Sequence, residues 1–356
     1  MEPAVLCTGR EAPCLLDEVW QLILGLLRGV EPLRCASVCR QWQLWTPLCV
    51  RFVLRRFLKR ATDQQLSCLR NVVKLELSRS TKSADAITDV GLCSLVNLHS
   101  LNLSHNPVIT DAAVSCLTNL THLDLRGREV QVGAALTGLT SLQGLCIIQN
   151  TRVIDAVLTT LRNLTLLYLD QNLCITDAAL STLTQLQILS LVTNTLITDD
   201  GLAPLTRLST LTLVYCPGIT GRALQDKPAL VDLALGDPSH RIQAPHITHL
   251  TQLSALRVSY FSLDTQTLRC LTRLTRLEIR ARERVPVDAL LLLTALRELQ
   301  LGGSCTDAFA ADMMTSHSLT TLTNLRQLSF TSNPRVDTTL LASALSPLCL
   351  LRFDAV

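Results

Sequence analysis

The stretch Leu164–Leu186, LTLLYLDQNLCITDAALSTLTQL, decides the fold, because Leu186–Leu208, LQILSLVTNTLITDDGLAPLTRL, follows it with the same pattern. Each copy has Leu-x-x-Leu-x-Leu, then an asparagine, Asn172 or Asn194, and then Ile-Thr-Asp. A pattern that returns at a fixed offset indicates a repeat architecture, in which each copy forms one small structural unit.

The same leucine template returns along most of the chain. Its successive offsets are 26, 22, 22, 22, 22, 22, 22, 23, 21, 22, 29 and 23 residues, and a truncated copy closes the series at Leu348. The twelve full copies start at Val72, Leu98, Leu120, Leu142, Leu164, Leu186, Leu208, Leu230, Leu253, Leu274, Leu296 and Leu325. Chance does not produce seven offsets of 22 in twelve.

The chemistry of each copy predicts a strand, a turn and a short helix. In Leu-x-Leu the leucines point to one face of a strand and alternate residues point to the other. Six copies have Asn or Cys in the turn: Asn106, Asn150, Asn172, Asn194, Cys216 and Asn333. Thr followed by Asp suits a helix start, because the hydroxyl can cap free amides and the carboxylate favours the positive end of the helix dipole. No copy can bury its own leucines, so stacked copies should form a solenoid.

This pattern resembles the leucine-rich-repeat superfamily, in the short-period type that carries Ile-Thr-Asp-x-x-Leu on its convex side. The resemblance implies an α/β solenoid, a leucine-rich-repeat horseshoe with its strands on the concave side. We expect this domain to cover residues 72–356, with about 12 repeats and a C-terminal partial repeat. The later copies depart from the template in the Asn/Cys position, where they have Pro238, Phe261, Arg282 and Ser304.

The segment before the repeats contains all three tryptophans and predicts a small all-α domain over residues 13–50. We expect three short helices there, and Val19, Leu22, Ile23 and Leu26 give the first one an apolar stripe. The segment resembles an F-box. The residues that match the family pattern are Leu15, Asp17, Glu18, Ile23, Leu24, Val38, Cys39 and Trp42, whereas Leu16 stands where the family usually has Pro.

The F-box resemblance implies docking on a Skp-family adaptor of a cullin-based (SCF-type) ubiquitin ligase, with the repeats presenting a protein substrate. The matching positions that would serve adaptor docking or internal packing are Leu15, Leu16, Val19, Ile23, Val38, Cys39 and Trp42. The alternative is a non-catalytic repeat scaffold or regulator whose N-terminal helices only cap the solenoid, since terminal repeats need a polar cover.

A basic amphipathic helix is the interpretation of residues 51–71, as a linker between the two domains. Five basic residues and no acidic ones lie between Arg51 and Arg60, interleaved with apolar side chains. The helix face could be merely solvated, or it could contact an acidic adaptor surface or serve nuclear import.

The residues that flank the strand leucines predict a substrate-binding patch on the concave face. The first and later repeats have polar or charged residues in these columns, whereas the middle repeats have mostly apolar ones. The candidate substrate-binding residues are Ile148, Leu166, Tyr168, Asp170, Ile188, Val192 and Val214. An apolar centre with a polar rim is typical of a partner site, although Ile, Val and Tyr also simply favour strands.

The 29-residue repeat that starts at Leu296 has about seven extra residues, which fall within Gly302–Ser318. They could form a recognition loop or a tolerated insertion.

Composition and missing motifs argue against other classes of function. Hydrophobic residues make up 48% of the chain and the net charge is only +3, which argues for a packed core and against nucleic acid as the main partner. The 14 cysteines are scattered, which fits a reducing compartment, cytoplasmic or nuclear. We expect no membrane segment, no metal at His240, His246 and His249, no cofactor and no catalytic residues. An enzyme hidden in the irregular repeats between Leu230 and Ser318 is the third hypothesis.

Overall fold

The computed structural model describes residues 52–53, 63, 66, 71–78, 87–236, 241–280, 287–302, 324–331 and 350–354. The chain divides into two compact units, Met1–Leu164 and Thr165–Val356. Both units repeat the predicted strand, turn and short helix, so the repeat is confirmed. The segment expected to be F-box-like, residues 13–50, lies outside the described residues.

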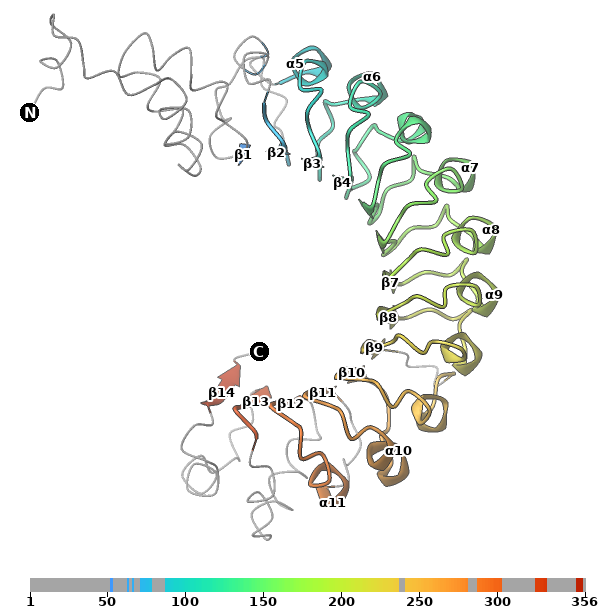
Figure 1. Ribbon diagram of the computed structural model, residues 1–356, viewed down its shortest axis with the longest axis vertical. Helices are drawn as coiled ribbons and strands as arrows, with labels where there is room; N and C mark the ends of the chain where they lie inside the picture. Colours follow the sequence, from blue (N-terminus) through green and yellow to red (C-terminus); the bar gives the residue numbers. More distant parts are fainter. Residues whose placement is uncertain are drawn as a thin grey trace, which may run out of the picture. The chain divides into compact units, whose positions relative to one another are not determined.

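The first unit has short parallel strands that pair in sequence order. Its elements are β1 (Phe52–Val53), β2 (Lys74–Glu76), α5 (Asp89–Cys93), β3 (Ser100–Asn102), α6 (Asp111–Val114), β4 (His122–Asp124), the 3-10 helix η2 (Ala134–Gly138), β5 (Gly144–Cys146) and α7 (Asp155–Leu158). Figure 1 shows the strands of this unit on one side and its helices on the other.

The second unit continues the same order with longer parallel strands. Its elements are β6 (Leu166–Tyr168), α8 (Asp177–Leu180), β7 (Ile188–Val192), α9 (Asp199–Leu202), β8 (Thr210–Val214), η3 (Gly221–Leu224), β9 (Asp232–Gly236), η4 (Ala244–Ile247), β10 (Ala255–Ser259), α10 (Thr265–Cys270), β11 (Arg276–Arg280), α11 (Val287–Leu290), β12 (Glu298–Gly302), β13 (Gln327–Thr331) and β14 (Leu350–Asp354). Its strands and helices also lie on opposite sides (Figure 1).

The core of each unit lies between its strands and its helices. Strand pairing aligns equivalent leucines of successive repeats, such as Leu189 with Leu211 and Leu211 with Leu233. All three are fully buried. Burial of one such side chain stabilises the fold by about 1.5–3 kcal/mol, and the next repeat supplies the covering surface.

Buried asparagines hold each turn to the preceding repeat. The side chain of Asn194 is fully buried, and its Nδ2 donates to the carbonyl oxygen of Asn172 at 3.1 Å. Its Oδ1 accepts from the amides of Leu196 at 3.2 Å and Ile197 at 3.1 Å. In the first unit, Asn106 Nδ2 donates to the carbonyl oxygen of Leu77 at 2.8 Å, and its Oδ1 accepts from the amides of Val108 and Ile109. In the next repeat, Cys216 takes this position and its Sγ donates to the carbonyl oxygen of Leu191 at 3.2 Å.

The recurring Thr-Asp pairs link the helix starts of successive repeats. Thr198 caps α9 as predicted, because its Oγ1 accepts from the amide of Asp200 at 3.3 Å. Asp177, one repeat earlier, accepts from both the amide and the hydroxyl of Thr198, at 2.8 and 2.5 Å. Asp89 binds Thr110 and Asp199 binds Thr220 in the same way. These carboxylates therefore have a structural role at the helix starts, as predicted. Their hydrogen bonds to the threonine of the next repeat were not predicted.

Residues 51–71, the predicted linker helix, contain a strand as well as helical positions: residues 63 and 66 are helical, and Phe52–Val53 are not. Phe52–Val53 form strand β1, which pairs with β2 at an offset of 22 residues. Asp63 accepts from the amide and hydroxyl of Thr88 at 2.8 and 2.6 Å, so it occupies the position of the repeat aspartates. Leu66 is fully buried. The repeat period therefore reaches back to Phe52 and does not start at Val72. The prediction of a helix is wrong at Phe52–Val53, where the leucine template is lost although the strand register and the aspartate of the repeat remain.

The 29-residue repeat keeps its strand pairing. Leu299 of β12 pairs with Leu328 of β13, so the extra residues do not interrupt the sheet. The predicted insertion, from residue 303 onward, lies outside the described residues.

Asn194→Ala should lower the free energy of unfolding by about 3 kcal/mol, because two turn amides and one carbonyl lose their buried partner. Asn119→Ala is the matched control, since this exposed side chain makes one bond, to the carbonyl oxygen of Val96 at 2.9 Å, and its loss should cost less than about 0.5 kcal/mol. Urea unfolding of both variants, followed by circular dichroism, measures the difference. Equal losses would contradict the role of the buried asparagine.

Candidate functional site

Alternation along each strand places a row of side chains on the side of the sheet away from the helices, which we call the strand face. In β7, Leu189 and Leu191 are fully buried in the core, whereas Ile188 and Val192 at the strand ends are only half-buried. The same alternation holds in β8, where Thr210, Thr212 and Val214 are half-buried. The described helices of the second unit all lie on the other side of the sheet (Figure 1), so none of them covers these side chains.

The second unit brings six of the seven predicted substrate-binding residues onto the strand face of three successive strands. Leu166 pairs with Ile188, and Val192 pairs with Val214. All six are half-buried: Leu166, Tyr168, Asp170, Ile188, Val192 and Val214. The seventh, Ile148, is half-buried in the first unit, just after β5. Their placement fits a binding surface, and their role in binding a substrate stays a prediction.

Asp170 ties the end of β6 to β7. Its Oδ1 accepts from the Ser190 hydroxyl at 2.7 Å and from the amide of Val192 at 3.1 Å. Burial raises the pKa of this carboxyl, and the two hydrogen bonds oppose that rise only in part. The apolar rows, by which we mean the strand-face positions Leu166, Ile188, Val192 and Val214 with their neighbours, therefore contain one carboxylate that is costly to ionise.

Small residues on β9 separate the apolar rows from charged ones. Ala234 and Gly236 occupy strand-face positions, and both are buried. Gly236 lies under Val214, because a β carbon at Gly236 would come within 3.0 Å of Val214 Cγ1. The strand face thus has no large side chain in these two rows of β9.

The charged side chains around β10–β12 neutralise one another. Arg257 binds Asp232 at 2.9 Å, Arg276 binds Glu298 at 2.6 Å, and Arg280 binds Glu278 at 2.7 Å. The hydrogen bond from Arg276 lowers the pKa of Glu298. The later repeats do return to charge, as predicted, but the pairs leave no net charge on these rows. Because the pairs are largely exposed, each adds little to stability.

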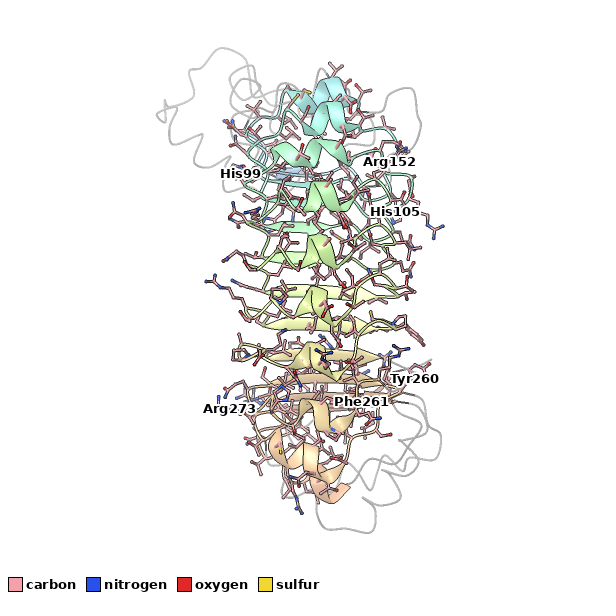
Figure 2. All side chains as sticks on the ribbon, turned by 90° about the vertical axis from the view of Figure 1, so that its right-hand side faces the viewer. His99, His105, Arg152, Tyr260, Phe261 and Arg273 are labelled. Atoms are coloured by element: carbon pink, nitrogen blue, oxygen red, sulfur yellow. The ribbon has the colours of Figure 1, made fainter. Side chains whose placement is uncertain are left out.

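Two tyrosines extend the apolar rows onto the edge where the strands end. The rings of Tyr215 and Tyr260 meet edge to face with centroids 6.3 Å apart, and the two residues are 44% and 41% exposed. Hydrogen bonding to Tyr260 raises the pKa of Tyr215. Both residues have positive φ, 55° and 57°, in a turn position that Gln149, Gln171 and Thr193 share. Figure 2 labels Tyr260 at this edge beside Phe261.

Sequence reasoning missed this tyrosine pair, although its signal was present. Both tyrosines come two residues after the last leucine-type position of their strand, Leu213 or Val258. Phe261, which stands in the asparagine position, is buried and fills the turn with an aromatic ring. The columns chosen for prediction stopped at the strand ends and left the turns out.

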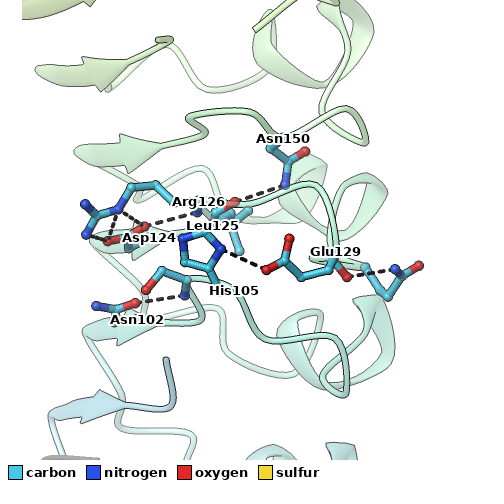
Figure 3. A network of polar contacts seen from close by, with 9 residues as sticks. Asn102, His105, Asp124, Leu125, Arg126, Glu129 and Asn150 are labelled. Atoms are coloured by element: carbon cyan, nitrogen blue, oxygen red, sulfur yellow. Dashed lines mark hydrogen bonds and ion pairs between the residues drawn. The ribbon is translucent and has the colours of Figure 1, made fainter. Parts of the chain in front are cut away.

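The strand face of the first unit is polar, as predicted, and Figure 3 shows hydrogen-bonded pairs on this face and on the neighbouring turn edge. Arg126 binds Asp124 at 2.6 Å, and Nδ1 of His105 lies 2.8 Å from Oε1 of Glu129. Hydrogen bonding of its own backbone and of His105 lowers the pKa of Glu129. Gln131 donates from Nε2 to the Glu129 carbonyl oxygen at 2.8 Å. This exposed network orders the turn edge and gathers no convergent group for catalysis.

The histidine cluster does not assemble a metal site in the part of the chain that the structure describes. No group of three or more potential ligands occurs there. His246 Nδ1 accepts from the amide of Gln243 at 3.0 Å, and His249 Nε2 lies 3.1 Å from the carbonyl oxygen of Leu224. His240 lies outside the described residues, as do all seven predicted adaptor-docking residues. Among the described helices, none is long and apolar enough to cross a bilayer.

Comparison with known proteins identifies the fold. No protein-family model matches the chain, and no curated protein matches it in sequence. An internalin from Listeria monocytogenes is 23% identical, with 87% of this chain and 81% of that chain covered and a TM-score of 0.47. A leucine-rich-repeat protein from Leptospira interrogans is 17% identical, with coverages of 92% and 100% and a TM-score of 0.47. The TLR13–ssRNA13 complex is 21% identical, with coverages of 80% and 44% and a TM-score of 0.52.

Similarity at these identities shows the fold and nothing about partners. The repeat geometry, with parallel strands paired in sequence order and buried template leucines, is that of a leucine-rich-repeat solenoid, as predicted, and the TLR13 structure, with its TM-score of 0.52, supports this fold. Solenoids of this kind expose one extended sheet surface for binding.

Asp170→Asn should raise the melting temperature at pH 7, because it removes a carboxylate whose pKa is raised by burial. Stability from an acid with a raised folded-state pKa is present below the unfolded pKa and is lost as pH rises through the folded one. The gain of the variant should therefore shrink as pH falls toward 3.8, the unperturbed value. Thermal unfolding from pH 7 to pH 3.5 tests this, and a pH-independent difference would contradict it.

Proposed function

We propose that this protein is a non-catalytic scaffold that binds a protein partner on the strand face of its second unit. The observation that carries the proposal is the set of half-buried apolar side chains on β6–β8, of which Ile188, Val192 and Val214 lie on neighbouring strands. Apolar rows beside polar ones are the usual anatomy of a protein interface. A further aromatic contact is available at the Tyr215–Tyr260 pair.

The charge pattern favours a protein over a nucleic acid. Binding to phosphate backbones depends on cations that are free to replace counterions. The three strand-face arginines of β10 and β11 are each bound to a carboxylate. A neutral, mixed surface of this kind suits the polar rim of a protein interface, where charges set orientation more than affinity.

We further propose that the partner is a substrate for ubiquitylation. The F-box-like segment would dock on a Skp-family adaptor of an SCF-type cullin ligase, and the strand face would hold the substrate. This rests on the match of Leu15, Ile23, Val38, Cys39 and Trp42 to the F-box pattern. Its position directly before the repeats also supports the proposal, because β1 begins the repeat series at Phe52.

The alternative is a scaffold or regulator whose N-terminal helices only cover the first repeat. The two hypotheses differ in what residues 1–50 do. A deletion that extends to residue 60 would remove β1 and expose β2 under either hypothesis. A deletion of residues 1–50 keeps β1 and therefore separates the two hypotheses more sharply.

Adaptor binding tests the ligase proposal directly. Full-length protein and a purified Skp-family adaptor should form a complex in size-exclusion chromatography, and Leu15→Ala combined with Trp42→Ala should abolish it. The deletion of residues 1–50 should also abolish it while the repeats stay folded by circular dichroism. If the intact protein binds no Skp-family adaptor, and the deletion variant aggregates, the capping hypothesis holds instead.

A charge placed in the apolar rows tests the strand face. Val214→Glu should leave adaptor binding and melting temperature unchanged, because Val214 is a half-buried surface residue. Some proteins should co-purify with the wild type under proteasome inhibition and not without it, and the Val214→Glu variant should no longer bind them. Ala178→Glu, on an exposed position of α8, is the matched control on the helix side and should keep them. Loss in both variants or in neither would count against this surface.

A further inference from the structure

Lys227 stands where the other repeats have a core leucine. The stretch before each strand reads Leu-Thr-x-Leu in several repeats, as in Leu205–Leu208 and Leu271–Leu274. In the repeat that follows Leu205–Leu208 it reads Lys227-Pro-Ala-Leu230. The equivalent Leu205 and Leu271 are fully buried, and Lys227 is only 2% exposed. One repeat therefore has an ammonium group in a position built for a leucine side chain.

The buried ammonium group has little compensation. Its Nζ donates to the carbonyl oxygen of Gln225 at 3.2 Å. Of the ion pairs formed by the described residues, none includes Lys227. Burial lowers the pKa of Lys227, and the charge of the neighbouring Asp226 opposes this fall only in part. A buried charge without a paired counterion is costly unless something else supplies one.

A pocket of about 670 Å³ opens beside this lysine. Its volume lies within the range of small-molecule pockets, roughly 300–1,000 Å³. The polar part of its lining consists of Thr206, Asp226, Lys227, His249, Thr251 and Gln252. None of these residues belongs to the strand face, so the pocket is separate from the proposed partner surface. It lies on the edge where the strands begin, which Figure 2 marks by Arg273.

A break in the side-chain ladder of this edge accompanies the pocket. Arg207 donates to Gln185 Oε1 at 2.5 Å, and Arg273 donates to Gln252 Oε1. The repeat between these pairs has Ala229 in the same position, which has no polar group to continue the ladder. Because Oε1 of Gln252 is already bound, its amide nitrogen is left as a donor for the pocket.

We propose that this pocket binds the carboxylate group of a small organic acid, with Lys227 as its counterion. The buried ammonium would gain the ion pair that the chain does not provide, and Gln252 and the threonine hydroxyls could donate further hydrogen bonds. A singly charged carboxylate fits better than a phosphate, because Asp226 also lines the pocket and would repel a dianion more strongly. Pro228 and Leu250 give the pocket an apolar wall for the rest of the acid.

Thermal unfolding of the full-length protein in sodium acetate, propionate and benzoate, at constant ionic strength with chloride, tests the proposal. At least one of the three should raise the melting temperature in a saturable way, as expected for a ligand that binds only the folded state. Benzamide, the neutral isostere of benzoate, should not. Lys227→Leu restores the residue of the other repeats and should therefore fold. It should weaken carboxylate binding by about tenfold or more, the loss expected for a charged hydrogen bond.

Lys74→Leu is the matched control, because it removes the same charge from an exposed position of β2, and it should keep the wild-type response. The proposal is overturned if none of the three acids exceeds chloride, or if Lys227→Leu responds as the wild type does. A larger shift with inorganic phosphate than with the three acids would also overturn the assignment to a carboxylate.

Discussion

The structure depends on one constraint: a repeat can bury its leucines only if the backbone amides and carbonyls of its turn find hydrogen-bond partners inside the core. A turn that enters the core brings backbone amides and carbonyls with it, and each is costly if left without a partner. Asn194 meets that need by serving two amides of its own turn and one carbonyl of the repeat before it. The bond joins each turn to the repeat before it, as do the bonds from Asn106 to Leu77 and from Cys216 to Leu191. The Asp177–Thr198 bonds repeat the arrangement at the helix starts.

In this arrangement the strand face of each unit takes no part in the core and can contact other molecules. The leucines are buried in the core, and the asparagine and aspartate side chains bond the backbone of the turns. The side chains at the alternate strand positions are therefore not needed for the core or the turns. In the second unit these positions are mostly apolar on β6 and β7, combine Thr210 and Thr212 with Val214 on β8, are small at Ala234 and Gly236 of β9, and carry paired charges from Asp232 to Glu298. A protein partner could contact all three zones, and Asp170 is the one costly polar group among the apolar ones.

Most of the fold could be predicted from the sequence because each position of the repeat has one structural role: core burial, turn hydrogen bonding or helix capping. Leucine period, asparagine turns and threonine caps were all readable from spacing. The aspartate bond to the next repeat was not, because it joins residues 21 positions apart in the chain through a turn whose path the sequence does not give. The strand β1 was missed since basic residues around Phe52 suggested a helix and hid the register that pairs it with Lys74.

The site was predictable only in part. Alternation was enough to place Ile188, Val192 and Val214 on the strand face, because their neighbours are leucines. The contact between Tyr215 and Tyr260 needed knowledge of a left-handed turn residue in two repeats. Lys227 was visible as a departure from the template, but only its burial and the pocket beside it give the departure a chemical meaning.

The strand face of the second unit, and not its helix side, is where we expect the partner to bind. Site-specific photocrosslinking in cells under proteasome inhibition tests this most directly, with benzoylphenylalanine at Val192 on the strand face and at Ala178 on the exposed side of α8. We predict a discrete protein crosslinked from position 192 and none from position 178. Crosslinking of the same protein from position 178 alone would contradict binding on the strand face.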